Sequence, residues 1–492
     1  MNAPFDPIED RRAIIDPRGL HDELAGASKA RATAALTNAL EKGREEIARR
    51  LRAEPHRGRN AARSTAYLQA QLVRLAYDHV TGDDPPELAI VGLGGTGRGE
   101  MAPYSDLDLM FLTSGKPSGE TQEIVQALLY LLWDLQLKVG HSLRSIDELM
   151  SLARNDMTVR TAFLEARLLW GSEDIFEAAS QRFRTKIVSG SAAEYVAAKL
   201  AERDERHEKM GGSRYVVEPN VKDGKGGLRD LQTLYWIGKY VYDVRQPSEL
   251  VSVGLLTAEE FAMFERAERF FWAVRCHLHL EAERPEERLG FEYQKSIARR
   301  MRYANRPGKS AVERFMHFYF LNAKTVGDLT GVFLAQLDEK MARKGLRFAL
   351  PTIRRRPKAL AGFVLDRGRL SIPSDDFFEE DPVRLIEMFA LAAREQLEIH
   401  PTAMRAATRD SKLIRARVRK DPRANALFLE VLTNVNAPDV VLRWMNEAGV
   451  FGRFIPDFGR VVAQMQFDMY HHYTVDEHAI RAIGLLAKIE RG

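Results

Sequence analysis

The pattern of apolar and polar residues predicts strands and helices within one N-terminal domain. An apolar run over residues 88–91 predicts a buried strand, and a second run over 107–112 predicts another strand after a glycine-rich turn. A leucine-rich helix over 120–135 leads to a third strand over 137–142. Because the helices and strands do not alternate regularly, this order predicts an α+β fold with a small mixed sheet rather than a doubly wound parallel sheet.

Two helix starts follow the third predicted strand. Ser145 is followed three residues later by Glu148, which is the spacing of a capping box. Asn155 or Asp156 starts the next helix, and we expect that helix to run on to Arg167.

Helical spacing of apolar residues dominates the rest of the chain. It predicts helices over residues 27–53 and 64–80, ahead of the first strand. Residues 174–345 are also helical by pattern, except for a glycine-rich and basic stretch at 216–229. From residue 382 onward the pattern is again helical.

Changes in this pattern divide the chain into five segments. A basic, proline-marked break at 354–357 and an acidic run at 375–381 indicate a linker between two helical parts. The predicted segments are a helical extension (1–60), the α+β domain (61–175), a helical domain (176–345), the linker (346–380) and a C-terminal helical domain (381–492).

The composition is that of an ordinary globular protein. Of the 492 residues, 45% are hydrophobic and 29% are charged, and the net charge is +4. So small a charge gives no basis for nucleic-acid binding. The single cysteine, Cys276, rules out an intramolecular disulfide. The chain has neither a signal peptide nor the run of about 20 apolar residues that a membrane span needs, so we expect a cytoplasmic protein with no membrane partner.

Two aspartates at the start of the second strand carry the first chemical signal. Asp106 and Asp108 are two residues apart, so their side chains lie on the same face of a strand. Neighbouring carboxylates repel each other, and their oxygens suit a shared Mg²⁺ or Mn²⁺. The glycines before them, including Gly94 and Gly95, leave room for a phosphate chain beside backbone N–H groups. Together these features predict a metal–nucleotide site, whereas an isolated Asp-x-Asp is more often a solvated strand edge.

Two later stretches supply further candidates. Lys222 and Arg229 lie in the stretch 216–229, which either folds against a phosphate or carboxylate or is a solvated loop. His478 lies in a segment rich in histidine and acidic residues, 467–483, which suits either a hydrolytic metal site or a polar helix start.

Four separated segments carry a resemblance to known proteins. They are GLGGTGRGEMAPYSDLDLMFL (92–112), EPNVKDGKGGLRDLQTLYWI (218–237), WAVRCHLHLEAERPEERLGFEYQKSIA (272–298) and MYHHYTVDEHAIRAI (469–483). The first segment resembles the signature of the DNA polymerase β-like nucleotidyltransferase superfamily. All four are similar to segments of the bacterial PII uridylyltransferase/uridylyl-removing enzymes, and the resemblance covers about residues 60–490.

The resemblance implies two opposed reactions. In that family a nucleotidyltransferase domain moves UMP from UTP to a tyrosine of the PII signal protein, and an HD-type phosphohydrolase domain removes it. UTP and PII are therefore the implied partners, with glutamine as an effector of the full-length enzyme only. By this resemblance 61–175 is the nucleotidyltransferase domain and 381–492 is the start of a truncated HD domain, so we expect the removing activity to be lost or crippled.

The resemblance also implies roles for individual residues. Asp106 and Asp108 match the catalytic, metal-binding aspartates, and His478 matches the first histidine of an incomplete HD metal site. The expected nucleotide-binding residues are Gly94, Gly95, Arg98, Ser105, Lys222 and Arg229. The superfamily usually places a third carboxylate on a later strand, but residues 137–142 contain none, which leaves Glu165 or Asp147 as substitutes.

Two other functions are compatible with the same residues. The chain could be a different nucleotidyltransferase, which transfers adenylyl groups to a protein or a small acceptor. It could also be a non-catalytic nucleotide-sensing module with a structural Asp-x-Asp.

Overall fold

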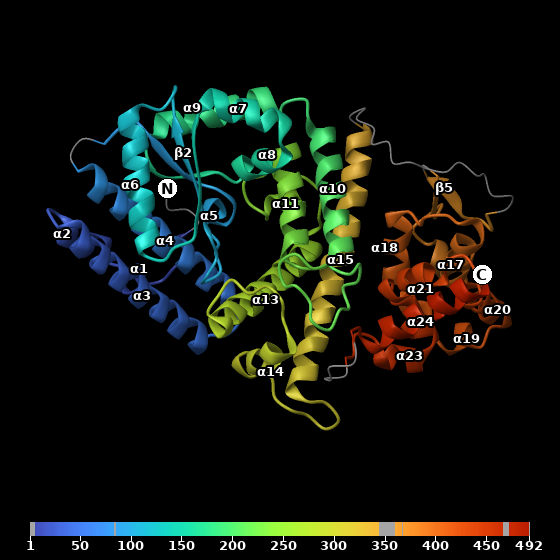
Figure 1. Ribbon diagram of the computed structural model, residues 1–492. Coiled ribbons are helices and arrows are strands. Elements are labelled where there is room, and N and C mark those ends of the chain that lie inside the picture. Colours follow the sequence, from blue (N-terminus) through green and yellow to red (C-terminus); the bar gives the residue numbers. More distant parts are fainter. Residues whose placement is uncertain (1–4, 83–84, 344–359, 367, 466–471, 492) are drawn as a thin grey trace.

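The computed structural model describes residues 5–82, 85–343, 360–366, 368–465 and 472–491 (Figure 1). Its main sheet has four strands, β1 (Ala89–Gly92), β2 (Leu107–Thr113), β3 (Val139–Ser145) and β4 (Arg167–Gly171), in the order β3-β2-β1-β4. Strand β1 is antiparallel to β2 and β4, whereas β2 and β3 are parallel. This small mixed sheet among many helices confirms the predicted α+β fold.

Alternate residues of the central strands pack on opposite faces of the sheet. Ile90 and Phe111 belong to the core on one face, which α4 (Gly58–Thr81) and α6 (Gly119–Asp134) cover. Val91 and Leu112 belong to a smaller core on the other face, under α7 (Ile146–Asn155), α8 (Met157–Leu164) and α9 (Glu173–Phe183). Both faces are thus buried, and the candidate site residues Asp106 and Asp108 lie at an end of the sheet, where β2 begins.

Two local predictions in this domain are wrong. The glycine turn contains a short helix, α5 (Gly94–Arg98). Helix α8 ends at Leu164, and Arg167 is the first residue of β4 rather than part of the helix. Strand pairing with β1 outweighs the helical pattern there. The capping box of Ser145 and Glu148 is confirmed at the start of α7.

The N-terminal helices and the middle of the chain share the larger core. Helices α1 (Arg11–Ile14), α2 (Pro17–Leu24) and α3 (Lys29–Ala53) pack around α4. Helix α4 in turn packs against α13. The helices of the middle segment are η2 (a π-helix, Arg184–Val188), α10 (Ala192–Lys209), α11 (Leu228–Tyr242), α12 (Glu249–Ser252), α13 (Ala258–Ala282), α14 (Phe291–Arg300) and α15 (Ala311–Arg343). This shared packing brings α13 close to the strand ends.

The C-terminal part has a core of its own, which extends from Phe363 to Ile480. It lies beside α15 and is drawn in orange and red in Figure 1. Its elements are β5 (Val364–Asp366), β6 (Arg369–Ser371), α16 (Phe377–Glu380), α17 (Arg384–Glu395), α18 (Pro401–Asp410), η3 (Ser411–Leu413), α19 (Ala416–Arg419), α20 (Pro422–Leu432), α21 (Pro438–Glu447), α22 (Val450–Phe454), α23 (Pro456–Val461) and α24 (Val475–Glu490). The basic break at 354–357 lies outside the described residues.

None of the described helices has both the length and the apolar composition that crossing a membrane requires. The boundaries between the five predicted segments stay predictions.

Candidate active site

A cavity of about 380 Å³ lies where the ends of the strands meet the middle segment. It is lined by Gly94, Gly95, Arg98, Glu100, Met101, Ser105, Asp106, Asp108, Glu165, Lys222, Arg229, Arg275, Pro285 and Glu287. The structure thus brings together all eight residues that the sequence assigned to catalysis or nucleotide binding in the transferase. Residues more than 100 positions apart in the sequence line the same space.

Asp108 is held by its backbone at the start of β2. Its N–H donates to Thr96 Oγ1 at 3.1 Å, and its carbonyl accepts from Leu93 N at 3.0 Å. Loss of solvation raises the pKa of the Asp108 carboxyl, and the charge of Asp106 adds to the rise, while Lys222 opposes it. The two carboxylates therefore repel each other within the cavity.

The strand beside Asp108 leaves room for its carboxylate. Gly140 of β3 is the register partner of Asp108. A Cβ at Gly140 would lie 2.8 Å from Asp108 Oδ1. Any larger residue there would push the Asp108 carboxylate out of its place.

Helix α5 depends on the backbone conformation at its first residue and on side-chain hydrogen bonds at its last turn. Gly94 begins it with a φ of +50°, a conformation that favours glycine. At the other end, Arg167 of β4 donates to the carbonyls of Thr96 at 2.9 Å and Gly97 at 3.0 Å. Burial lowers the pKa of Arg167 to about 10. These bonds satisfy the last carbonyls of α5, so a helix that is rich in glycine is kept in place.

The two candidates for a third carboxylate differ in position. Glu165 lines the cavity, is buried, and forms an ion pair with Arg98 of α5. Its Oε1 has no hydrogen-bond partner within the described residues. Asp147 is exposed, pairs with Arg182 at 2.8 Å, and does not line the cavity.

The two aspartates of the cavity would suit a magnesium ion whose remaining ligands came from a phosphate compound and water. Within the described residues, no group of three or more histidine, cysteine or acidic side chains is arranged to bind a metal. Mg²⁺ is commonly bound by one or two carboxylates, with phosphates and water as its other ligands. Asp106 and Asp108 supply such a pair, and their mutual repulsion favours a cation between them.

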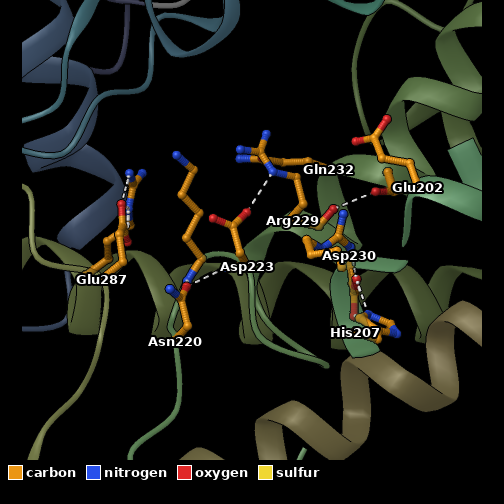
Figure 2. Close-up of polar contacts among 12 residues, drawn as sticks. Glu202, His207, Asn220, Asp223, Arg229, Asp230, Gln232 and Glu287 are labelled. Atoms are coloured by element: carbon orange, nitrogen blue, oxygen red, sulfur yellow. Dashed lines mark hydrogen bonds and ion pairs between the residues drawn. The ribbon is translucent and has the colours of Figure 1, made fainter. Parts of the chain in front are cut away.

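Lys222 of the glycine-rich loop before α11 and Arg229 of the first turn of α11 both line the cavity. Figure 2 shows the contact between Arg229 and Asp223. Asn220 Oδ1 accepts from the N–H groups of Lys222 at 3.1 Å and Asp223 at 2.6 Å, which turns the chain sharply. Arg229 Nε donates to Asp223 Oδ1 at 3.1 Å. Burial lowers the pKa of Lys222, and the charges of Arg275 and Arg229 lower it further.

A buried aspartate holds the base of this loop. The Asp230 side chain accepts from His207 Nε2 at 2.9 Å, from Gly226 N at 2.8 Å and from Arg206 at 2.5 Å (Figure 2 shows Asp230 beside His207). The glycine at 226 is required, because its φ is +81° and a Cβ would lie 2.5 Å from the carbonyl of Ala323. The loop is therefore ordered and packed, rather than the solvated loop that composition alone suggested.

Two charged residues that line the cavity, Arg275 and Glu287, had no role predicted from the sequence. Glu287 accepts from Arg275 Nε at 2.9 Å, and both residues line the cavity. Burial acts to raise the pKa of Glu287, but Arg275 and His279 hold it at about 2. All three belong to the segment 272–298, so the signal was in the sequence without an assigned role.

His478 lies apart from this cavity. It is exposed in the first turn of α24 and is not brought together with the predicted transferase residues. Its acidic neighbours are buried: Asp476 accepts from Asn446 at 2.9 Å, and Glu477 pairs with Arg443 at 3.0 Å. These two acids stabilise the start of α24, and no metal-binding group forms around His478 within the described residues.

Known protein families and proteins resemble the chain over most of its length. The family model described as GlnD PII-uridylyltransferase matches residues 194–334, and the one described as uridylyltransferase GlnD third domain matches 363–454. The chain is 58% identical to a bifunctional uridylyltransferase/uridylyl-removing enzyme of Novosphingobium aromaticivorans, 53% to one of Erythrobacter litoralis and 47% to one of Rhodospirillum rubrum.

These similarities extend over 99% of the chain in each case. They cover 55%, 54% and 53% of the three relatives, so the chain spans about half of their length. Over nearly all of its own length the chain is therefore similar to about half the length of proteins named bifunctional uridylyltransferase/uridylyl-removing enzyme.

Proposed function

We propose that the chain transfers UMP from UTP to a tyrosine of a PII signal protein, and that the cavity between β2 and the glycine-rich loop is the site of transfer. One observation carries the proposal: eight residues assigned from the sequence converge on this cavity from α5, the start of β2 and the turn before it, the glycine-rich loop and the first turn of α11. The names and identities of the relatives support the same reaction.

The side chains of the cavity suit a nucleoside triphosphate. Arg98, Lys222 and Arg229 supply positive charge for the phosphates. Asp106 and Asp108 would hold Mg²⁺ or Mn²⁺, which supplies charge neutralisation and orientation of the phosphates when it is bound. The cavity thus combines cations for the phosphates with carboxylates for the metal.

The proposed reaction is an in-line displacement. The tyrosine oxygen forms a bond to the α-phosphorus of UTP, and the bond from that phosphorus to the leaving pyrophosphate breaks. The phenol proton, whose pKa is about 10 in water, passes to a carboxylate of the cavity or to water.

The reverse reaction is assigned less fully. The relatives' names include a uridylyl-removing activity, and His478 is the candidate residue for it in this chain. Control by glutamine, like a cytoplasmic location, remains a prediction from the resemblance and the composition.

A labelling experiment tests the proposal. Purified PII is incubated with the chain, UTP and Mg²⁺, and the mass of PII is measured. We expect PII to gain one UMP, and the double variant Asp106→Asn, Asp108→Asn to lose at least about 100-fold in rate. The control is Asp134→Asn, which removes an exposed carboxylate of α6.

Three results would contradict the proposal. Undiminished labelling by the double variant would exclude the two aspartates as catalytic residues. A strong preference for ATP in the same assay would indicate adenylyl transfer. Calorimetry that found UTP binding independent of Mg²⁺, without turnover, would indicate a nucleotide-sensing module.

A further inference from the structure

A buried histidine of α13 anchors the turn that carries Asp106. The backbone N–H of Tyr104 donates to His279 Nδ1 at 3.4 Å, although the two residues are 175 positions apart. The His279 side chain is fully buried. Asp106 is only two residues from this anchor, so the middle segment of the chain holds the start of β2 in place.

The hydrogen bond from Tyr104 fixes the tautomer of His279. Nδ1 accepts a hydrogen bond and so carries no proton, which places the proton of the neutral ring on Nε2. Burial lowers the pKa of His279, which keeps the ring neutral. Nε2 lies 3.5 Å from Glu287 Oε1, an electrostatic contact that is longer than a good hydrogen bond.

Glu287 continues the connection to the glycine-rich loop. Its carbonyl oxygen accepts from the N–H of Val221 at 2.8 Å, and the next residue of that loop is Lys222. Its carboxylate is held by Arg275. A continuous path of contacts therefore joins the turn with Asp106 to the loop with Lys222, and His279 lies in the middle of it.

We propose that His279 is a positioning residue for the transferase site, which sets the place of Asp106 relative to Lys222 through its contacts with Tyr104 and Glu287. This inference rests on the proposed function. His279 does not line the cavity, so it acts through its neighbours and not on the substrate.

The chain offers a matched control two residues away in the same helix. His277 is also buried, and its Nε2 donates to the carbonyl of Pro55 at 3.0 Å. It contacts the turn between α3 and α4 and does not line the cavity. His277→Leu and His279→Leu each remove one buried imidazole and one hydrogen bond to the backbone, so a general loss of packing would affect both variants alike.

Three measurements test the proposal: the affinity of the free protein for Mn²⁺ by electron paramagnetic resonance, amide hydrogen exchange over residues 104–108, and kcat/KM for labelling of PII. We expect His279→Leu to weaken Mn²⁺ binding and lower kcat/KM by about 10- to 100-fold, and to speed exchange at Tyr104. His277→Leu should change each by less than about twofold. His279→Asn, whose Oδ1 can accept from Tyr104 N–H, should restore part of each loss.

The outcomes separate this inference from the proposed function. If the unaltered chain does not label PII, the proposed acceptor is wrong, while Mn²⁺ affinity and hydrogen exchange still report on positioning. Unchanged Mn²⁺ affinity and exchange in His279→Leu would overturn the positioning role. Equal losses in the two leucine variants would also overturn it. If His279→Leu does not fold, the comparison is made with His279→Phe and His277→Phe, which keep a ring but cannot form the hydrogen bond, and equal values in that pair would overturn the positioning role as well.

Discussion

Like charges are placed close together on both sides of the cavity. Asp106 helps to raise the pKa of Asp108, while Arg275 and Arg229 help to lower the pKa of Lys222. Repulsion between like charges therefore acts within each cluster, and Glu287 and Asp223 partly offset it around Lys222. A metal–triphosphate complex carries a cation for the aspartates and anions for the basic residues, so its binding would relieve both repulsions together.

His277 gives a pH test that is independent of the cavity. Burial lowers its pKa from 6.5 to about 4. Between these values the unfolded chain binds the proton and the folded chain does not, so stability falls as the pH falls from 6.5 towards 4. Between pH 7.5 and pH 4.5, His277 should lower the free energy of unfolding by up to about 3 kcal/mol. Urea unfolding at the two pH values should show that His277→Gln lacks this part of the decrease. Equal pH dependence in the two proteins would show that His277 is not buried as a neutral ring.

The residues that the sequence analysis placed together share short motifs with fixed spacing. Asp106 and Asp108 lie on one strand, so their joint orientation follows from strand geometry. Arg275 and Glu287 share no short motif with the aspartates. They were not predicted as site residues, because charged residues near the end of a helix usually form a solvated surface. The packing of α13 against α4, together with the ion pair between Arg275 of α13 and Glu287, brings these two residues to the cavity that the aspartates line.

At the scale of elements, α5 shows why local propensity misled the prediction. Glycine disfavours helices, so the stretch after β1 was interpreted as a turn. Its helical form depends on Arg167, which was expected to lie in a helix and in fact begins β4. The two errors are linked. Strand β4, which was not predicted, supplies Arg167, and Arg167 stabilises α5, which was not predicted either.

Gly97 is the position of α5 that tolerates a side chain least. A Cβ there would lie 2.2 Å from the carbonyl oxygen of Glu165 and 2.7 Å from that of Gly92. We expect Gly97→Ala to lower the free energy of unfolding by about 1 to 3 kcal/mol and to reduce UTP binding, because α5 must move away from β4. Gly115→Ala is the control, since a Cβ there meets nothing within 4 Å. Equal thermal stability of the two variants would contradict the prediction.

The loop before α11 is a second element with a specific requirement. Asp230 joins Gly226 of the loop to Arg206 and His207 at the end of α10. Asp230→Asn keeps the size of the side chain but removes the charge that both basic residues face. We expect a rise of about tenfold in KM for UTP, because Lys222 and Arg229 lose their fixed positions.

Hydrogen exchange distinguishes this effect from a general loss of stability. Exchange over residues 220–229 should become faster in Asp230→Asn than exchange in α13. The control, Asp204→Asn, alters an exposed aspartate of α10 that pairs with its neighbour Arg203. An unchanged KM together with faster exchange would show that the order of the loop does not control UTP binding.

At the scale of the whole molecule, the glycine-rich loop and the C-terminal unit are directly connected. Thr474 N donates to the carbonyl of Tyr215 at 3.1 Å, and Val217 N donates to that of His472 at 3.1 Å. These bonds lie just before α24 in one segment and just before the glycine-rich loop in the other. Sequence patterns could not predict this pairing, because each segment contributes only a few residues and has no strand periodicity.

The ion pair of Arg214 with the C-terminal unit allows the strength of the contact between that unit and the rest of the chain to be measured. Its guanidinium is buried against Gly327 of α15 and pairs with Glu447 of α21 at 3.1 Å. We expect Glu447→Gln to destabilise the protein by about 3 kcal/mol, because it leaves a buried charge without its nearest partner. Exchange at residues 214–217 and 472–474 should become faster than exchange in the sheet.

A double-mutant cycle separates the ion pair from the packing around it. Arg214→Met removes the charge and keeps most of the apolar volume, so the double variant with Glu447→Gln should be more stable than Glu447→Gln alone. Additive losses in the cycle would mean that the two side chains do not interact in solution. Because residues 214–217 continue into the loop with Lys222, a change in KM for UTP in Glu447→Gln would further show that the C-terminal unit influences the transferase cavity.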